Sequence, residues 1–324
     1  MKTALPTYFP LLVLLLLVLL PFGASSFYLS FTTDLLITTL LALSLNLLVG
    51  YGGLVSFGHA AYFGVGAYTC GLLMKALGWS FTLSLLAAVA MSVLVALVAG
   101  FFCVRLTKVY FSMLTLAFSQ IIWAVVFRWN DVTGGDQGVN GVPYPDFAWL
   151  KAIPFLAERT DPQFFYYLVL LIVAGCTWFV YRLTHSGFGR CLIASRENPE
   201  RCTFIGLNVR TIQLITFCIA AGLAGVAGSL FGIFNRGLFP DFLHYSKGAE
   251  ILIMVLLGGS GYFWGAAVGA TAMLLLHNAT SAYSDYWGAI LGLILAALTL
   301  LFPEGLSGIV ARVRQKLQAR GGKP

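Results

Sequence analysis

Long apolar stretches, separated by single charged residues or short charged clusters, make up most of the chain. The pairs of charged residues that bound these stretches are Lys2 and Asp34, Asp34 and Lys75, Lys75 and Arg105, Lys108 and Arg128, Asp161 and Arg182, Arg210 and Arg236, Glu250 and Asp285, and Asp285 and Glu304. A membrane-spanning helix needs about 20 mostly apolar residues. A transmembrane β-barrel would show apolar and polar residues alternating over segments of about ten residues, whereas the apolar runs here are continuous. The pattern therefore predicts an all-α polytopic membrane protein with about 8–10 transmembrane helices.

Two of these stretches are too long for one helix, and each contains a glycine cluster. The stretch 35–74 breaks at Gly50-Tyr51-Gly52-Gly53, and the stretch 251–284 breaks at Gly258-Gly259-Ser260-Gly261. Both clusters are followed by a Gly-Ala pair between apolar helices, which indicates an internal repeat. Single glycines often serve only helix packing, but glycine-interrupted helices in matching positions mark substrate paths in transporters. We therefore predict two Gly-broken repeat segments that face each other near a translocation path.

The distribution of Lys and Arg predicts which loops face the cytoplasm. The loop 182–210 and the tail after Pro303 are rich in Arg and Lys, so both are expected on the cytoplasmic side. The loop 128–163 contains more acidic than basic residues and is expected outside. Three simple crossings after Arg210 would place the basic tail outside, unless the stretch 251–284 enters and returns as a broken hairpin. Irregular backbone at membrane depth needs protein or a water-filled cavity around it, so the topology also points to this hairpin as part of the path.

The N-terminal apolar run, residues 11–20, has two interpretations. It has the length of a signal-peptide core followed by small residues, or it is the first transmembrane helix. We favour the uncleaved helix, because the predicted topology requires it. The expected organisation is then a helix and short outer loop over 1–30, a transmembrane domain over 31–308 and a basic cytoplasmic tail over 309–324.

Composition supports the membrane assignment and excludes several classes of protein. Hydrophobic residues make up 59% of the 324 residues and charged residues only 10%, against roughly 25% charged in soluble domains. Intrinsic disorder requires low hydrophobicity and is also excluded. The net charge of +7 comes largely from one loop and one tail, and it gives no support to nucleic-acid binding. No phosphate-binding loop, metalloprotease motif, nucleophile elbow or C-x-x-C pair stands in a usable context, so no catalytic residue, metal or cofactor is expected.

The predicted cytoplasmic loop contains a short helix. Asn198 suits the N-cap, Pro199 the first helical position and Glu200 the first turn, while Gly206 suits a helix stop. The helix is expected over about residues 199–205. Its apolar residues Phe204 and Ile205 gain little in water, which favours a surface that docks a partner. The alternative is a basic loop that only sets the topology.

Polar side chains within the apolar stretches are the candidates for the path, because burying them in a membrane is costly. The candidate path residues are Asn46, Ser56, His59, Gln120, Glu250, Gly258 and Gly259. Several alternatives stay open. His59 is equally compatible with a core histidine bonded to a backbone carbonyl that the glycine break exposes, and Gln120 with a hydrogen bond between helices. Asp34 and Glu250 each precede a repeat helix, which pairs the two repeats, but both also suit the interfacial end of a helix.

Several motifs resemble the M-type permease subunit of branched-chain amino-acid ABC importers. The first runs from Leu45 to Gly64 and reads LNLLVGYGGLVSFGHAAYFG, the second is GFGR at 187–190 followed by RENP at 196–199 and GLNV at 206–209, and the third is EILIMVLLGG at 250–259. The outward segment TGGDQG at 133–138 resembles the M-type subunit more than its shorter H-type partner. The matches extend from about residue 34 to residue 308.

The resemblance implies a permease of the bacterial cytoplasmic (inner) membrane that has no ATPase of its own. The expected partners are an H-type permease subunit, two ATP-binding-cassette ATPase subunits, a periplasmic substrate-binding protein and membrane lipid. The loop helix then corresponds to the coupling helix that docks on the ATPase. Its candidate coupling residues are Glu197, Glu200, Arg201 and Gly206, although Arg201 and Cys202 replace the alanines of the family pattern.

The substrate class follows from the resemblance as leucine, isoleucine and valine. A permease of the same architecture for urea or another small amide remains an alternative. A channel or carrier that works without an ATPase, and a membrane scaffold without transport, are alternatives from other classes. The glycine-broken repeats argue against the scaffold.

Overall fold

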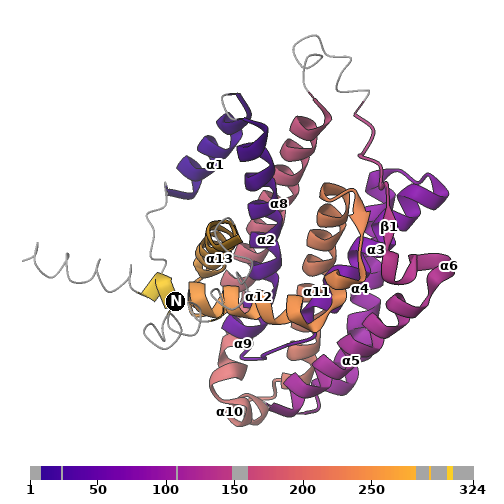
Figure 1. Cartoon of the computed structure of the whole chain (residues 1–324). Coiled ribbons are helices and arrows are strands. Elements are labelled where there is room, and N and C mark those ends of the chain that lie inside the picture. The colour runs from indigo at the N-terminus through magenta and orange to yellow at the C-terminus, as the bar shows by residue number, and fades with distance from the viewer. Residues whose placement is uncertain are drawn as a thin grey trace, which may run out of the picture.

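The computed structural model describes residues 9–22, 25–106, 109–147, 160–281, 292 and 305–308, and the structural statements below concern these residues. The first half contains the helices α1 (Phe9–Leu19), α2 (Ser26–Asn46), α3 (His59–Leu77), α4 (Phe81–Cys103), α5 (Val109–Arg128) and α6 (Asn130–Thr133). The second half contains α8 (Asp161–His185), α9 (Gly187–Glu197), α10 (Pro199–Phe204), α11 (Val209–Phe234), α12 (Tyr245–Gly258) and α13 (Gly265–Ser281). Figure 1 shows α9 and α10 together at one end of the molecule, below α8 and α11. The predicted tail 309–324 lies outside the described residues.

Short helical turns and one strand pair complete the described elements. The 3-10 turns are Leu20–Phe22, Gly135–Gln137 and Pro240–Leu243, a π-helical turn covers Leu47–Tyr51, and the strands are β1 (Val139–Asn140) and β2 (Gly237–Leu238). Since nearly all described backbone is helical, the chain is an all-α polytopic membrane protein, as predicted.

Six helices in the described ranges are long and apolar enough to cross a membrane: α2 with its π turn, α3, α4, α5, α8 and α11. The helices α1 and α12 are shorter, with 11 and 14 residues, and α13 has 17. The last apolar stretch of the sequence, bounded by Asp285 and Glu304, lies almost wholly outside the described residues. The count of about 8–10 spans therefore stays a prediction.

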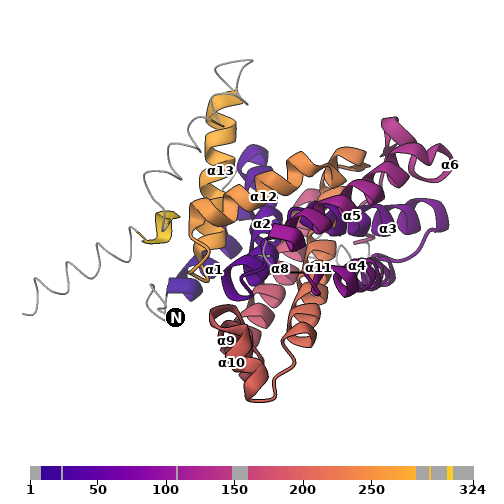
Figure 2. The same ribbon diagram turned by 90° about the horizontal axis from the view of Figure 1, so that it is seen from below.

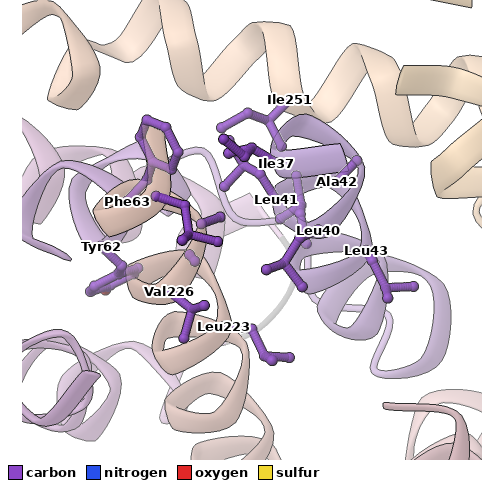
Figure 3. Packing of buried hydrophobic residues seen from close by; sticks show 14 of the residues in the cluster. Ile37, Leu40, Leu41, Ala42, Leu43, Tyr62, Phe63, Leu223, Val226 and Ile251 are labelled. Carbon is purple, nitrogen blue, oxygen red and sulfur yellow. The ribbon is translucent and has the colours of Figure 1, made fainter. Parts of the chain in front are cut away.

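The helices α2, α3 and α11 form the centre of the bundle, and α4 and α5 lie at its periphery. We compared the most apolar 18-residue window of each helix. The share of this window that is buried is 78% in α2 and 72% in α11, but only 28% in α4 and 22% in α5. Figure 3 shows side chains of α2, α3, α11 and α12 packed together, among them Ile37, Leu41, Phe63 and Ile251. The apolar surface that α4 and α5 expose suits contact with lipid.

Small residues let α3 and α11 approach closely, as is typical of helices in membranes. A side chain at Gly66 would collide with the backbone of Gly225, and one at Gly228 with the backbone of Phe63. The Ser229 hydroxyl lies 3.1 Å from the carbonyl oxygen of Gly66 and 2.8 Å from that of Gly225. The glycines thus bring the two backbones together, and Ser229 adds a polar link between them.

The predicted outer loop 128–163 is partly ordered by contacts that the sequence did not predict. In β1 and β2, Val139 pairs with Leu238 and Asn140 with Gly237 in antiparallel register. The Lys75 ammonium donates to the Asn140 carbonyl at 2.5 Å, which ties the loop to the end of α3. Near this strand pair, burial raises the pKa of Tyr144 although the positive charge of Arg236 opposes the shift, so the phenol is neutral near pH 7.

Candidate functional site

The first glycine break separates α2 from α3. The helix α2 passes into the π turn Leu47–Tyr51, and an irregular segment then leads to His59 at the start of α3. Gly53 has φ +68°, in the left-handed region that glycine adopts without steric cost. Because a residue with a β-carbon would be strained there, Gly53 fixes the point at which the chain leaves the helix.

The second break joins α12 to α13 through a compact turn. Gly259 follows α12 with φ +98°, and the amide of Tyr262 donates to its carbonyl at 3.1 Å. A side chain at Gly258 would collide with Gly265, and one at Gly269 with the carbonyl of Met254. The two helices therefore pack closely on either side of the turn. Figure 2 shows that α12 and α13 meet there at an angle. Both predicted breaks are confirmed, although the first has an extended exit and the second a compact turn.

The two breaks contact each other. The side-chain amide of Asn46, at the end of α2, donates to the backbone carbonyl of Tyr262 at 3.2 Å. The Cα of Gly50 lies so close to the carbonyl of Ser260 that a β-carbon could not be accommodated. The prediction that the breaks face each other is thus confirmed, whereas their place beside a translocation path stays a prediction.

Buried polar atoms without a hydrogen-bond partner gather around the first break. The side chains of Asn46, Ser56 and His59 are all fully buried. Within the described structure, Oδ1 of Asn46, Oγ of Ser56 and Nδ1 of His59 have no hydrogen-bond partner. Buried polar groups are nearly always paired with protein, water or ligand, so these three atoms provide hydrogen-bonding capacity that the folded chain leaves unused.

His59 joins the two helices that flank the break. Its Nε2 lies 2.7 Å from the hydroxyl of Ser44, on α2, and both residues are fully buried. The alternative of a bond to an exposed backbone carbonyl is therefore wrong: the partner is a hydroxyl, and the carbonyl of Leu41 accepts from the same Ser44. This chain of hydrogen bonds holds the start of α3 against α2.

Replacing Ser44 by alanine should lower the stability of the protein by about 1–3 kcal/mol, because it leaves Nε2 of His59 buried without a partner. Thermal unfolding of the purified protein in detergent measures the change. Ser84→Ala is the matched control, because Ser84 is equally buried but its hydroxyl has no partner to lose. Equal shifts in the two variants would show that the bond between Ser44 and His59 contributes nothing.

Gln120 lies on α5 directly after Ser119, and Ser119 and Thr115 of this helix lie close to the first break. A side chain at Gly58 would meet the carbonyl of Thr115 and, at 3.3 Å, the β-carbon of Ser119. Nε2 of Gln120 and Oγ of Ser119 are buried without a partner among the described residues. The structure thus places Gln120 near the exit of the break, but no contact joins it to Asn46, Ser56 or His59 in the described hydrogen bonds.

The acids Asp34 and Glu250 lie away from the breaks, among other charged groups. Both are inside helices, on α2 and α12, so the prediction that each precedes a repeat helix is wrong. Glu250 forms an ion pair with Lys247 at 2.9 Å one turn earlier on α12, and Asp34 accepts a hydrogen bond from Thr38 at 3.3 Å. Each acid thus has a polar partner on its own helix. Asp34 also interacts electrostatically with Lys247, Glu250 and His277, so the two acids do belong to one cluster.

The loop helix matches its prediction closely. Oδ1 of Asn198 accepts the amide of Arg201 at 3.0 Å and caps α10, and Gly206 ends the turn with φ +85°. Cys202 is buried, whereas Phe204 is 89% and Ile205 75% exposed. The candidate coupling residues Glu197, Glu200, Arg201 and Gly206 are all exposed at this end of the molecule. The end of α10 therefore presents two large apolar side chains to solvent.

Sequence reasoning missed the residues that connect this loop to the breaks. The Arg196 guanidinium, at the end of α9, donates to the carbonyl of Gly50. The Tyr181 ring, near the end of α8, lies 5.5 Å from the ring of Phe263 in the second break. Nothing in the local sequence around Arg196 or Tyr181 signals these contacts, because they depend on how distant helices pack.

Known proteins resemble this chain over most of its length. The family described as "Branched-chain amino acid transport system / permease component" matches residues 27–301. The high-affinity branched-chain amino acid transport system permease protein LivM of Escherichia coli (strain K12) is 28% identical over 95% of this chain and 76% of its own length. The corresponding LivH of the same organism is 28% identical, over 48% of this chain and 50% of its own length.

A further relative is also named as a branched-chain amino acid transport permease. The probable branched-chain amino acid transport permease protein LivM of Methanocaldococcus jannaschii is 25% identical over 59% of this chain and 54% of its own length. No solved structure matches the chain significantly. Because the family match covers both glycine breaks and the loop between α8 and α11, the chain belongs to the family of permease components of branched-chain amino acid transport systems.

Proposed function

We propose that this chain moves leucine, isoleucine and valine inward as one of the two permease subunits of an ABC importer. The observation that carries the proposal is the contact between the two glycine breaks, at Asn46 and Tyr262, in a chain of this family. ATP hydrolysis is assigned to separate ATPase subunits, which drive alternating access. The relatives' names support the substrate class.

The proposed path follows the two breaks. A zwitterionic amino acid needs partners for its ammonium and carboxylate groups, and interrupted helices offer free backbone groups for both. The unpaired atoms of Asn46, Ser56 and His59 add polar partners on one side. We assign the buried turn at Gly258 and Gly259 to the other side. We assign Gln120 to the outer part of this path. Glu250 is already paired with Lys247, so we assign it to the charged cluster beside the path.

The proposed partners are an H-type permease, two ATPase subunits and a periplasmic binding protein. Relatives named LivM and LivH both match this chain, which supports pairing with a second permease. The exposed Phe204 and Ile205 support docking of an ATPase on α10. We place the loop 182–210 and the C-terminal tail on the cytoplasmic side of a bacterial inner membrane, because both are rich in Arg and Lys.

We also propose that α1 stays in the mature protein as the first transmembrane helix. Tyr166 and Tyr167 of α8 donate hydrogen bonds to the carbonyls of Leu17 at 2.7 Å and Val18 at 3.2 Å. Cleavage after α1 would leave the hydroxyl of the buried Tyr166 without this partner. The intact mass of the protein purified from its membrane should therefore include α1. A mass that begins after residue 22 would contradict the proposal.

Competition experiments test the substrate class. Uptake of labelled leucine by vesicles that contain the importer should be inhibited by unlabelled isoleucine and valine and unaffected by urea. Inhibition by urea but not by valine would favour a permease for small amides. Equal uptake by the chain alone, without its partners, would favour a carrier that works without an ATPase.

A further inference from the structure

We infer that Arg196 and Tyr181 are positioning residues that transmit movement of the ATPase-docking helix to both glycine breaks. The inference rests on the proposed function, because it assumes that α10 docks on an ATPase. It goes beyond that function by naming the contacts through which the force passes. The two residues lie on either side of the turn between α8 and α9, and α10 follows directly.

The first contact joins α9 to the break between α2 and α3. The guanidinium of Arg196 donates to the carbonyl of Gly50, which lies in the π turn at the end of α2. The last carbonyls of a helix lack partners within the helix, and a positive charge at this end is favourable. Arg196 thus holds the end of the helix at the point where the chain breaks.

Packing beside this hydrogen bond makes the connection stiff. A side chain at Gly53 would meet Cγ of Arg196 at 2.7 Å, so the arginine stem lies directly over the left-handed glycine. One turn earlier on α9, Leu192 is fully buried, and its Cδ1 would lie 3.5 Å from a β-carbon at Gly52. Although Arg196 itself is exposed to solvent, α9 thus contacts the first break through both Arg196 and the buried Leu192.

The second contact joins α8 to the break between α12 and α13. The ring of Tyr181 packs edge-on against Phe263, with centroids 5.5 Å apart and planes at 83°. Phe263 is buried and lies next to Tyr262, whose carbonyl accepts the hydrogen bond from Asn46. Aromatic pairs of this kind contribute about 0.5–1.5 kcal/mol beyond their buried area. One segment, from Tyr181 to Arg196, therefore holds both breaks and leads into α10.

Measuring how many leucine molecules are transported per ATP hydrolysed tests this inference in the complete importer. Arg196→Gln removes the charge and Tyr181→Ala removes the ring. In each variant we expect uptake to fall at least about tenfold while hydrolysis stays within about twofold of the wild type. Arg196→Lys keeps a charged donor and Tyr181→Phe keeps the ring, so both should retain most of the coupling.

Matched controls use exposed neighbours on the same two helices. Arg190→Gln removes the same charge from α9, and Trp178→Ala removes a ring from α8 that is 66% exposed. Both controls should transport and hydrolyse like the wild type. Unchanged coupling in either Arg196→Gln or Tyr181→Ala overturns the inference, and so does a proportional loss of uptake and hydrolysis. If one variant fails to assemble, the other decides, because the inference requires both contacts.

The wild-type complex separates this inference from the proposed function. If the wild type shows no ATP-driven leucine uptake, the proposed function fails. If the wild type transports leucine but the variants stay coupled, only the transmission through Arg196 and Tyr181 fails.

Discussion

Replacing Phe204 and Ile205 together by aspartate should abolish ATP-driven uptake by preventing the ATPase from docking. Burying an apolar side chain of this size contributes roughly 1.5–3 kcal/mol, and each 1.4 kcal/mol corresponds to about a tenfold change in affinity. We therefore expect ATPase binding to weaken by about 100-fold or more. Both side chains are highly exposed in the chain by itself, so its fold should not change. Co-purification of the ATPase with the detergent-solubilised permease measures the effect.

The control for this experiment is a variant that keeps the apolar surface. Phe204→Leu combined with Ile205→Val should retain both docking and uptake. The alternative of a basic loop that only sets topology makes a different prediction: the aspartate variant would then bind the ATPase as well as the wild type does. Normal co-purification of that variant would therefore remove the basis for assigning α10 to docking.

Gly50→Ala should reduce uptake at least about tenfold, with assembly of the importer retained. The added β-carbon would collide with the carbonyl of Ser260 and with Oδ1 of Asn46. Overpacking of this kind costs typically about 1–3 kcal/mol, and here it forces the two breaks apart. Uptake of labelled leucine in proteoliposomes, with the amount of assembled complex measured in parallel, gives the effect.

Gly261→Ala is the matched control within the second break. A β-carbon at Gly261 would have no heavy atom within 4 Å, so this variant should transport normally. Uptake by Gly50→Ala equal to that of Gly261→Ala would show that the close approach of the breaks is not needed for transport.

The sequence predicted those features that depend on local signals. Continuous apolar runs identified the long helices, and the cap residues Asn198 and Gly206 located α10 within one residue of its observed end. The glycine clusters located both breaks, because a helix cannot continue through left-handed backbone such as that at Gly53 and Gly259. The turn between α12 and α13 stands where the sequence predicts a broken hairpin, whereas the return of this hairpin across the membrane stays a prediction.

The remaining features depend on packing between distant segments, which local patterns do not encode. Glu250 bounds an apolar stretch in the sequence, but charged residues do not by themselves end a helix. The helix α12 therefore begins earlier, at Tyr245, and includes the ion pair between Lys247 and Glu250. The Ser44 hydroxyl became the partner of His59 only because α2 and α3 lie side by side. Likewise, the sequence shows Arg196 only as one of several basic residues in the loop. Its hydrogen bond to the carbonyl of Gly50 depends on how α9 packs against the first break.

The central claim is that leucine passes between the two breaks in an ATP-driven importer, and reversible crosslinking tests it most directly. Single cysteines at positions 54–56 are paired with single cysteines at 260–262 in a background without the six native cysteines. Leucine accumulation in proteoliposomes is then measured before oxidation, after oxidation and after reduction. We predict that at least one pair forms a disulfide, that uptake stops when it forms and that reduction restores uptake. Full uptake in a crosslinked importer, or no crosslink at any pair in any nucleotide state, would contradict the claim.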